Sequence, residues 1–265
     1  MKNLSKPEYS IDSSSRLSPF LTNGVMSVKE VINEYRKRKE INFGDNLKGL
    51  KRNISAFNSR LSWRCHFIQK LEDQPQIEFK SMHPAYEGIR DEFINELYFK
   101  SWKEGRTGFP IIDACMRSLI HTGWLPFRMR AMLVSFASYN LLIDWKKSGA
   151  YLAILFTDFD TGIHYSQMQM QSGVTGINAI RIYNPIKQSY DQDQEGTFIR
   201  KWVNELKNVH SAYIHEPWKM NKDLQEKFKC FIGIDYPEPI VDQGESSKFT
   251  KNLILSLIHI SEPTR

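Results

Sequence analysis

Apolar side chains recur along most of this chain at steps of three and four residues, the spacing that places them on one face of an α-helix. The longest such run consists of Leu50, Ile54, Phe57, Leu61, Cys65 and Ile68. It predicts a long helix from Leu50 to Glu72. A shorter run over residues 28–35 follows Ser27 and includes Glu30, and these two residues have the spacing of a capping box at a helix start.

Four further stretches carry the same helical pattern. They comprise residues 93–98, 110–120, 129–136 and 198–206, the last of which begins after Gly196. Pro110 suits a first helical turn, where its missing N–H would have no partner. Only residues 179–183 alternate polar and apolar side chains as a short β-strand does. The pattern therefore predicts an all-α, multi-helix domain whose helices are joined by long functional loops.

The composition is that of a soluble globular protein, with 41% hydrophobic and 25% charged residues among 265. The chain has no apolar run near the ~20 residues that a membrane span needs, and its first residues do not begin a signal peptide. Cys65, Cys115 and Cys230 lie far apart and form no C-x-x-C, which argues against a disulfide framework or a zinc site. We therefore expect a cytoplasmic protein with no membrane partner and no bound metal.

The charge balance is basic, with a formal net charge of +6 and a pI of about 9.1. A basic surface favours polyanions such as nucleic acid. Part of the excess lies in the run Arg36–Lys39, which fits a solvated helix end better than a dedicated DNA patch, because cations suit the negative end of the helix dipole. The charge therefore permits DNA as a partner without locating the surface that would bind it.

An ordered series of motifs runs through residues 102–218. It reads WKEGRTGFP at 102–110, TGW at 122–124, DFD at 158–160, RIYNP at 181–185 and HEPW at 215–218. In this order the motifs resemble the FAD-binding domain of the photolyase/cryptochrome family, and the resemblance covers nearly all of residues 14–240. It implies a helical domain that holds FAD, absorbs blue light and passes an electron to a DNA lesion or a signalling state.

The resemblance implies which residues hold the phosphates of FAD. They are Arg64 and the run Ser14, Ser15, Arg16, Leu17 and Ser18, in which Ser14 stands where a threonine is usual. Backbone N–H groups, hydroxyls and a nearby cation are what a diphosphate requires. Taken alone, the run would also fit a serine-rich helix cap. Together with the motifs further along the chain, it favours the cofactor.

The resemblance also implies contacts to the flavin itself. Arg130 and Asp158 correspond to an ion pair beside the ring, and Asp160 completes a D-x-D sequence that grips its edge. A fixed cation there would stabilise a negatively charged reduced flavin. A structural salt bridge or a helix cap would explain the same residues taken singly. His164 stands where the family has an asparagine facing the flavin, and it could tune flavin protonation or be a buried, hydrogen-bonded histidine.

The implied electron-transfer chain is altered. Met168 stands at the position of the tryptophan nearest the flavin, and methionine is a poor donor there. Trp145 matches the next tryptophan, so one link remains and the first is missing. Gln169 lies between Met168 and Met170 in a run with Gln167 and Gln171, and the amides of this run could read bases or satisfy buried loop backbone. We take Trp63, His164 and Trp145 as the candidate catalytic residues.

The implied lesion pocket also departs from the family. Arg60 replaces a glutamate that would accept hydrogen bonds from a pyrimidine dimer, which reverses the charge. Trp63 and Arg128 are kept, whereas Phe127 replaces an asparagine. Ala131 replaces a methionine and Met170 replaces a tryptophan, which brings the candidate substrate-binding set to Arg60, Trp63, Phe127, Arg128, Ala131 and Met170. These changes leave the type of lesion open.

Two expectations concern the scaffold and the extent of the chain. Asp113 and Arg117 lie four residues apart on a predicted helix and should form a structural ion pair. We expect residues 1–254 to form the FAD domain, either standing alone or, as we favour, as a piece of a longer protein with an α/β antenna domain ahead of it. The last eleven residues, 255–265, match the translation of a sequencing adaptor and are interpreted as a non-native tail.

The function favoured by the sequence is a light-dependent DNA-repair flavoprotein, a lyase that transfers an electron from excited reduced FAD to a pyrimidine lesion. Its expected partner is damaged DNA, in double- or single-stranded form. A blue-light photoreceptor without repair activity is the first alternative. An inactive fragment is the second.

Overall fold

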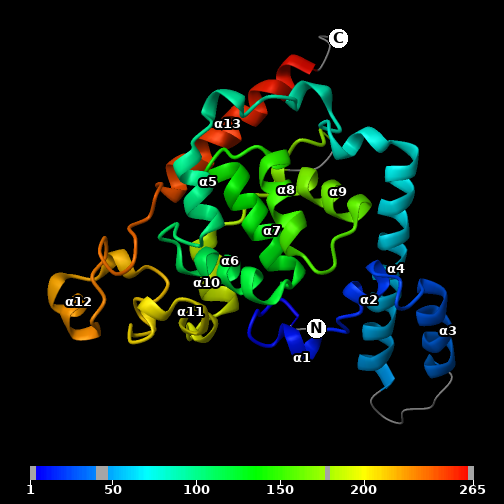
Figure 1. The fold of residues 1–265 in the computed structure, drawn as a ribbon, viewed down its shortest axis with the longest axis horizontal. Helices are drawn as coiled ribbons and strands as arrows, with labels where there is room; N and C mark the ends of the chain where they lie inside the picture. Colours follow the sequence, from blue (N-terminus) through cyan, green and yellow to red (C-terminus); the bar gives the residue numbers. More distant parts are fainter. Residues whose placement is uncertain (1–3, 40–46, 177–179, 262–265) are drawn as a thin grey trace.

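The computed structural model describes residues 4–39, 47–176 and 180–261 and is built from helices (Figure 1). The α-helices are α1 (Ser10–Ser13), α2 (Ser18–Thr22), α3 (Val28–Lys39), α4 (Leu47–Asp73), α5 (Glu96–Lys103), α6 (Pro110–Thr122), α7 (Phe127–Ser135), α8 (Trp145–Leu155), α9 (Thr161–Ser172), α10 (Pro185–Gln192), α11 (Thr197–Trp202), α12 (Lys222–Phe228) and α13 (Gln243–Ser261). Short 3-10 turns are η2 (Pro75–Glu78), η3 (Pro84–Tyr86), η4 (Asp91–Phe93), η6 (Asn204–Leu206) and η7 (Pro217–Lys219). Within these ranges there is no β-strand, so the all-α prediction is confirmed.

The core is centred on α6, which Pro110 opens and Gly123 closes in a left-handed conformation at φ +68°. Almost every side chain of α6 is buried, because α7, α10 and α11 pack around it. The helix after Met129 continues from α7 into a single π-helical stretch, η5 (Phe136–Asn140), which is wholly buried. Helix α13 covers η5, and Figure 1 shows it lying across one side of the central helices.

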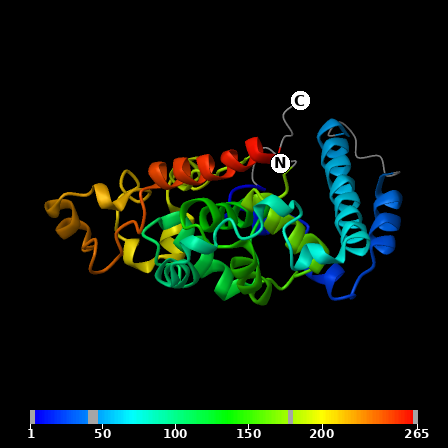
Figure 2. The same ribbon diagram turned by 90° about the horizontal axis from the view of Figure 1, so that it is seen from above.

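Helices α3 and α4 form a separate arm at one end of the molecule, side by side in both ribbon views (Figure 2). The predicted capping box at the start of α3 is present, since the Ser27 N–H donates to Glu30 Oε2 at 2.7 Å and the Glu30 N–H donates to Ser27 Oγ at 3.1 Å. Helix α4 confirms the long helix expected over residues 50–72. We call α3 and α4 together the arm.

Two of the apolar patterns that predicted one helix are each divided between two shorter helical elements. The 93–98 stripe is split, because Asn95 caps a new helix by accepting a hydrogen bond from the Tyr98 N–H. Ile94 and Leu97 consequently face solvent. The 198–206 helix ends at Trp202 and resumes as η6. Residues 180–184 form no strand, and the rest of the alternating stretch, 177–179, lies outside the described residues.

The predicted ion pair between Asp113 and Arg117 is wrong. Asp113 is fully buried and points to the start of α6, where it accepts hydrogen bonds from the Thr107 N–H, the Gly108 N–H and the Tyr236 hydroxyl. Arg117 instead forms a two-pronged pair with Glu205, at 2.8 and 3.0 Å. The loop donors compete successfully for Asp113 because a buried carboxylate needs several hydrogen bonds at once.

No described helix is long and apolar enough to cross a bilayer. The described His, Cys, Asp and Glu residues include no group of three that could hold a metal ion. Of the 255–265 segment, the backbone is described only to Ser261 and the side chains only to Ser256. The interpretation of that segment as a foreign tail therefore stays a prediction.

Candidate cofactor-binding site

The centre of the candidate site is a two-pronged ion pair between Arg130 of α7 and Asp158 of the α8–α9 loop. Arg130 Nη1 and Nη2 lie 2.8 and 2.9 Å from the two carboxylate oxygens, while its Nε donates to the Leu125 carbonyl at 2.7 Å. The Asp158 side chain is only 4% exposed. Burial alone would raise the pKa of Asp158, but the charge and hydrogen bonds of Arg130 and a hydrogen bond from Ser18 outweigh it and lower the pKa.

The serine-rich run, residues 14–18, also contacts this ion pair. Ser18 opens α2, and its hydroxyl donates to Asp158 Oδ2 at 2.7 Å. Ser14 lies between α1 and α2, and its Oγ is buried with no partner among the described residues. Arg16 adopts the left-handed backbone conformation, at φ +49°. Its guanidinium stacks on the Trp124 ring at 4.7 Å, a ring that Arg130 also approaches at 6.0 Å.

The other two residues of the run, Leu17 and Ser15, contribute less to contacts within the protein. Leu17 precedes α2 and provides no side-chain cap, and Ser15 is exposed. The run is therefore not the serine cap that its composition also fitted. A buried Ser14 hydroxyl without a protein partner is unusual, because such groups are normally hydrogen-bonded. That hydroxyl is free to bind a ligand.

A second ion pair joins the arm to α9. Arg64 Nη1 of α4 lies 2.8 Å from Asp160 Oδ2, and the two side chains are 16% and 15% exposed. Asp160 also caps α9, since its Oδ1 accepts from the Ile163 N–H at 3.4 Å. Arg64 Nε is buried and has no partner within the described chain. The helix-cap and cofactor interpretations of Asp160 are therefore compatible.

The crossing of α4 and α9 depends on Gly162, a residue that the sequence analysis did not single out. A Cβ atom there would lie 2.9 Å from the Phe67 carbonyl oxygen and 3.1 Å from Ile68 Cα. Only glycine allows two backbones to approach this closely. A glycine one residue into an otherwise regular helix is the sequence signal that could have indicated the crossing.

His164 is half-buried on α9, and its pKa lies below the ordinary value of a histidine. Its Nε2 lies 2.9 Å from the Gly149 carbonyl, to which it donates when Nε2 carries the proton. Burial is the main cause that lowers its pKa to about 4. The Phe159 and Tyr165 rings pack against it at 5.1 and 5.0 Å. The hydrogen bond and the lowered pKa favour the hydrogen-bonded interpretation of His164 over a role in flavin protonation.

The residues of the altered electron-transfer chain lie on α8 and α9. Trp145 begins α8, is 1% exposed and donates from Nε1 to Ser81 Oγ at 3.2 Å. Met168 is likewise buried against α8, where Gly149 leaves it room. Gln169 satisfies buried loop backbone, since its Nε2 donates to the Ile77 and Lys80 carbonyls and its Oε1 accepts from the Met82 N–H. Of the two roles considered for Gln169, the loop role is the one seen.

The expected lesion-contact residues come from three helices and differ in exposure. Arg60 and Trp63 face solvent on α4, where the Trp63 ring is 49% exposed and stacks on Phe67. Phe127 is exposed at the start of α7, and the adjacent Arg128 Nη1 lies 3.3 Å from Gln188 Oε1. The other two candidates are less accessible, with Ala131 buried on α7 and Met170 half-buried on α9.

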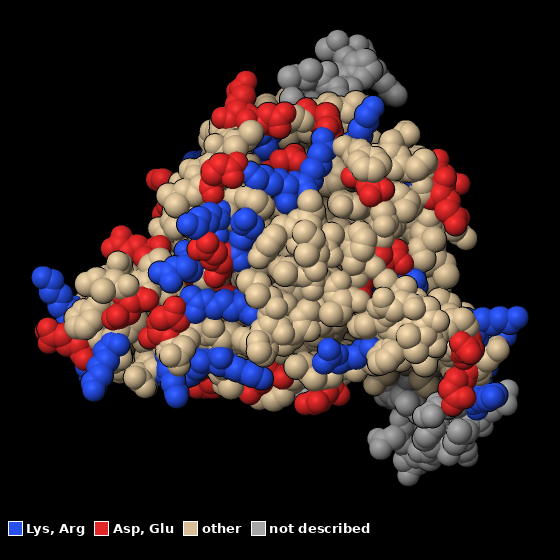
Figure 3. All heavy atoms as spheres, viewed as in Figure 1, with Lys and Arg blue, Asp and Glu red and all other residues tan. Residues whose placement is uncertain are grey.

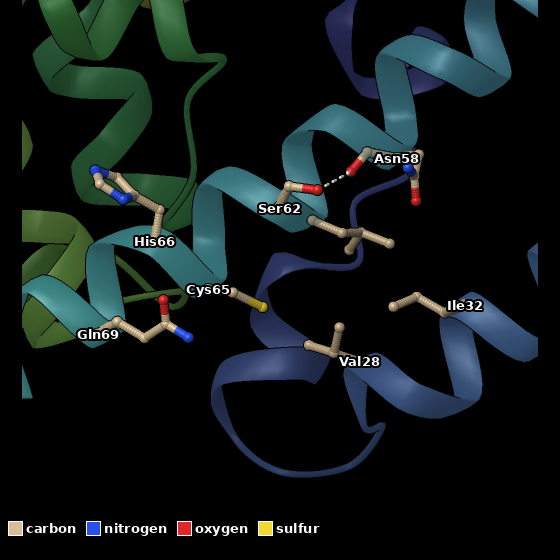
Figure 4. Close-up of a pocket in the computed structure, with 8 residues that line it drawn as sticks. Val28, Ile32, Asn58, Ser62, Cys65, His66 and Gln69 are labelled. Atoms are coloured by element: carbon tan, nitrogen blue, oxygen red, sulfur yellow. Dashed lines mark hydrogen bonds between the residues drawn. The ribbon is translucent and has the colours of Figure 1, made fainter.

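Two surface grooves lie beside these residues. One, of about 280 Å³, separates α3 from α4, where Val28 and Ile32 face Cys65 (Figure 4). Its lining contains none of the expected cofactor contacts. The other, of about 200 Å³, is lined by Arg16 and Trp124 together with residues of α1 and α11. Arg16 thus connects the serine-rich run to a solvent-accessible hollow.

The geometry brings four separate segments of the chain into one polar centre. It contains two guanidinium groups, two carboxylates and free hydroxyl and N–H groups on Ser14 and Arg64. Cations and hydroxyls suit a diphosphate, and carboxylates suit the hydroxyl and N–H donors of a ribityl chain and a flavin edge. These residues fit FAD, with Ser14 Oγ and Arg64 Nε as the unpartnered atoms that it would satisfy.

Comparison with known proteins also supports FAD as the cofactor. Residues 57–254 match the family described as the FAD binding domain of DNA photolyase. A deoxyribodipyrimidine photo-lyase from Alkalihalophilus pseudofirmus is 34% identical over 242 residues, which are 90% of this chain and 48% of that protein. The chain thus spans about half the length of the curated relatives it matches.

Solved structures resemble the whole described fold. A bacterial class III photolyase from Agrobacterium tumefaciens superimposes with a TM-score of 0.84 at 29% identity, covering 97% of this chain and 52% of that one. A cryptochrome from Synechocystis sp. gives a TM-score of 0.80 at 28% identity, covering 91% of this chain and 49% of that one. The fold is therefore shared by relatives named for repair and by relatives named as cryptochromes.

Proposed function

The chain belongs to the photolyase/cryptochrome family as its FAD-binding domain, with FAD as its cofactor, and we propose that it acts in light-dependent repair of DNA. The observation that carries the proposal is the polar centre in which Arg130, Asp158, Arg64 and Asp160 meet. In this centre each carboxylate is paired with its own guanidinium group. Bound FAD supplies light absorption and one-electron transfer.

The protein's own residues position and charge that cofactor. Ser14, Ser15, Arg16, Leu17, Ser18 and Arg64 are proposed for its phosphates, and Arg130, Asp158, Asp160 and His164 for the flavin and ribityl side. Arg130 is a fixed cation because three of its N–H groups are already held by protein oxygens. Such a cation stabilises negative charge that develops beside it without reorganising. His164 stays neutral there and can offer the unprotonated Nδ1 as an acceptor.

The proposed DNA surface uses the exposed residues around the site. Arg60, Trp63, Phe127 and Arg128 would contact the nucleic acid, with Ala131 and Met170 deeper in the pocket. On the face shown in Figure 3, Lys and Arg side chains are interspersed with acidic ones toward α5 and α12, and the area over α7–α9 carries few charges. The net charge of +6, with Arg60 and Arg128, should make DNA binding electrostatic and steeply dependent on salt, while the altered lesion contacts should make selectivity for a dimer weak.

A photoreceptor without repair activity is the alternative. It is favoured by one observation, the exposed Arg60 on α4 in place of a carboxylate that would accept hydrogen bonds from a dimer. The structural likeness to a cryptochrome is consistent with this alternative. Repair and photoreception share the cofactor site, so they are distinguished by the response to damaged DNA and not by FAD binding.

The test begins with flavin loading and ends with repair. The purified chain is reconstituted with FAD, reduced, and illuminated with oligonucleotides that carry a pyrimidine dimer or another pyrimidine lesion. Repair predicts restored bases in illuminated samples only. Loading without restoration of any lesion favours photoreception, and a folded chain that never acquires flavin absorbance contradicts both. A competition between damaged and undamaged DNA at physiological salt measures the selectivity, which we expect to be small.

A further inference from the structure

The three glutamines that alternate along α9 differ in their hydrogen bonding. The amide of Gln169 makes three hydrogen bonds to the backbone of the loop around η2. Gln167 Oε1 and Gln171 Oε1 are shielded from water and have no partner among the described residues. An amide oxygen that has left water without gaining a hydrogen bond raises the free energy of the folded chain. Support of loop backbone therefore explains Gln169 and leaves the other two amides unexplained.

The neighbours of α9 show where these two amides lie. Helix α4 crosses the side that carries Gly162, helix α8 covers the side of Met168, and the loop at η2 covers the side of Gln169. Helix α7 also packs against α9. Residues three and four apart share one face of a helix, so the two unpartnered glutamines lie with Met170 on the remaining side. That side borders α7 and is part of the proposed lesion pocket, to which Met170 belongs.

The proposed lesion contacts contain no oxygen that could accept a hydrogen bond. The two arginines and Trp63 can only donate, and the other three side chains of the set are apolar. A thymine or uracil ring presents two carbonyl oxygens with an N–H group between them, at N3. Arginines can serve the carbonyl oxygens, and Arg128 Nε is a buried donor without a described partner. The N3–H group needs an acceptor, and the glutamines of α9 carry amide oxygens on the side of α9 that borders this pocket.

We propose that Gln167 determines base specificity in the proposed pocket, and that its amide oxygen accepts a hydrogen bond from the N3–H group of a thymine or uracil base. Gln167 is half-buried, whereas Gln171 is 8% exposed and lies one helical turn further along α9. A base that enters the pocket therefore meets Gln167 before Gln171. The amide N–H beside that oxygen can donate to the neighbouring carbonyl of the same ring. The inference rests on the proposed function for the nucleic acid but not for the repair step.

The first test needs no DNA and compares Gln167→Met with Gln169→Met in urea unfolding. Methionine has nearly the length of glutamine but lacks the amide, so each variant removes polar atoms with little change in volume. Gln169→Met should lower the unfolding midpoint, because three backbone groups lose their partner. Gln167→Met should leave the midpoint unchanged or raise it, because its oxygen has no partner to lose. An equal fall in both variants would show that the Gln167 amide is structural and would overturn the proposal.

The second test measures DNA binding by the FAD-loaded chain in the dark. Two oligonucleotides carry a dimer formed either from thymine or from N3-methylthymine, which lacks the N3–H donor. The wild type should bind the methylated dimer about 3- to 10-fold more weakly, the worth of one hydrogen bond. Gln167→Met should bind both oligonucleotides alike, whereas a steric effect of the methyl group would persist in this variant. Gln69→Met, an exposed change at the α3–α4 groove, should discriminate as the wild type does.

Illumination of the same samples separates this inference from the proposed function. If the wild type restores the dimer but binds both oligonucleotides equally, repair stands and the reading of N3–H by Gln167 is overturned. Discrimination that remains in Gln167→Met overturns it as well. If no lesion is restored, yet the wild type discriminates and Gln167→Met does not, the repair proposal fails and Gln167 still stands as the base-reading residue.

Discussion

Helices α7–α9 and the arm both carry proposed FAD contacts, but the two regions are held in place by different forces. On α7–α9 the side chains around the site, such as Met168 and Gln169, are buried within the core. On α4 the described buried side chains are few, and Trp63 is half exposed. The arm is joined to α9 by the Arg64–Asp160 pair and by the close backbone crossing at Gly162.

The two regions therefore contribute to the site in different ways. Core packing fixes the positions of Arg130, Asp158 and His164 whether or not a cofactor is bound, because it buries the apolar surface of the helices that carry them. The arm buries few apolar side chains, Val31, Leu61 and Phe67 among those described, and its ion pair to α9 contributes only about 1 kcal/mol to stability. We therefore expect α7–α9 to be preformed and the arm to gain order when FAD binds.

The largest effect is expected from Arg130→Leu. The change leaves the Asp158 carboxylate buried without its counter-charge, which for buried pairs costs about 3–5 kcal/mol. The pKa of Asp158, now lowered by Arg130, should rise, and FAD affinity should fall strongly. Urea unfolding and flavin titration measure the two losses.

Arg117→Leu is the matched control for that experiment. It removes an equally two-pronged pair outside the site, in which the arginine is similarly exposed and the Glu205 carboxylate is more exposed than that of Asp158. It should lower the free energy of unfolding but leave FAD affinity unchanged. Equal loss of FAD affinity in both variants would mean that flavin binding follows general stability and not the charge of Arg130.

A smaller, pH-dependent effect is expected at His164. The folded-state pKa of His164 is about 4, against 6.5 in an unfolded chain, so between these values the unfolded state binds the extra proton. Stability should therefore be complete above pH 6.5 and decrease as the pH falls. Between pH 7 and pH 5 the loss amounts to about 2 kcal/mol.

His164→Gln should remove this part of the pH dependence, because glutamine can donate to the Gly149 carbonyl without titrating. His66→Gln, on the exposed side of α4, leaves His164 in place and should keep the wild-type slope. Urea unfolding at pH 7 and pH 5 provides the measurement. An unchanged slope in His164→Gln would show that His164 is charged in the folded protein.

The sequence allowed prediction of the features that depend on local chemistry. Apolar spacing predicted the long α4, Pro110 predicted the start of α6, and Ser27 with Glu30 predicted the cap of α3. It failed where a tertiary contact decided the outcome. Asp113 was expected to pair one helical turn away, but loop N–H groups and the Tyr236 hydroxyl, distant in sequence, bind it instead.

In the candidate site, too, the sequence predicted local features but not the contacts between distant segments. Motif order indicated the Arg130–Asp158 ion pair, which the structure contains, but it did not indicate that Arg64 pairs with Asp160. Gly162 was not singled out, because its role arises from the crossing of α4 and α9, which lie far apart along the chain. Packing between helices is the information that a single sequence lacks.

The smallest effect is expected from Arg64→Met, and it most directly tests whether the arm is a separate unit. The variant removes the Arg64–Asp160 pair but keeps the Asp160 cap and the Gly162 crossing, so the global cost should be about 1–2 kcal/mol. Amide exchange should rise in α4 and stay unchanged in α8 and α9. Arg60→Met, an exposed change on the same helix, should leave both unchanged.

Adding FAD sharpens this last experiment. If cofactor binding orders the arm, FAD should slow amide exchange in α4 of the wild type more than in α8. Arg64→Met should recover only part of that protection, because one of the groups proposed to hold the phosphates is gone. A global loss as large as that of Arg130→Leu, with exchange rising in α8 and α9 as well, would instead show that the arm and the core unfold as one unit.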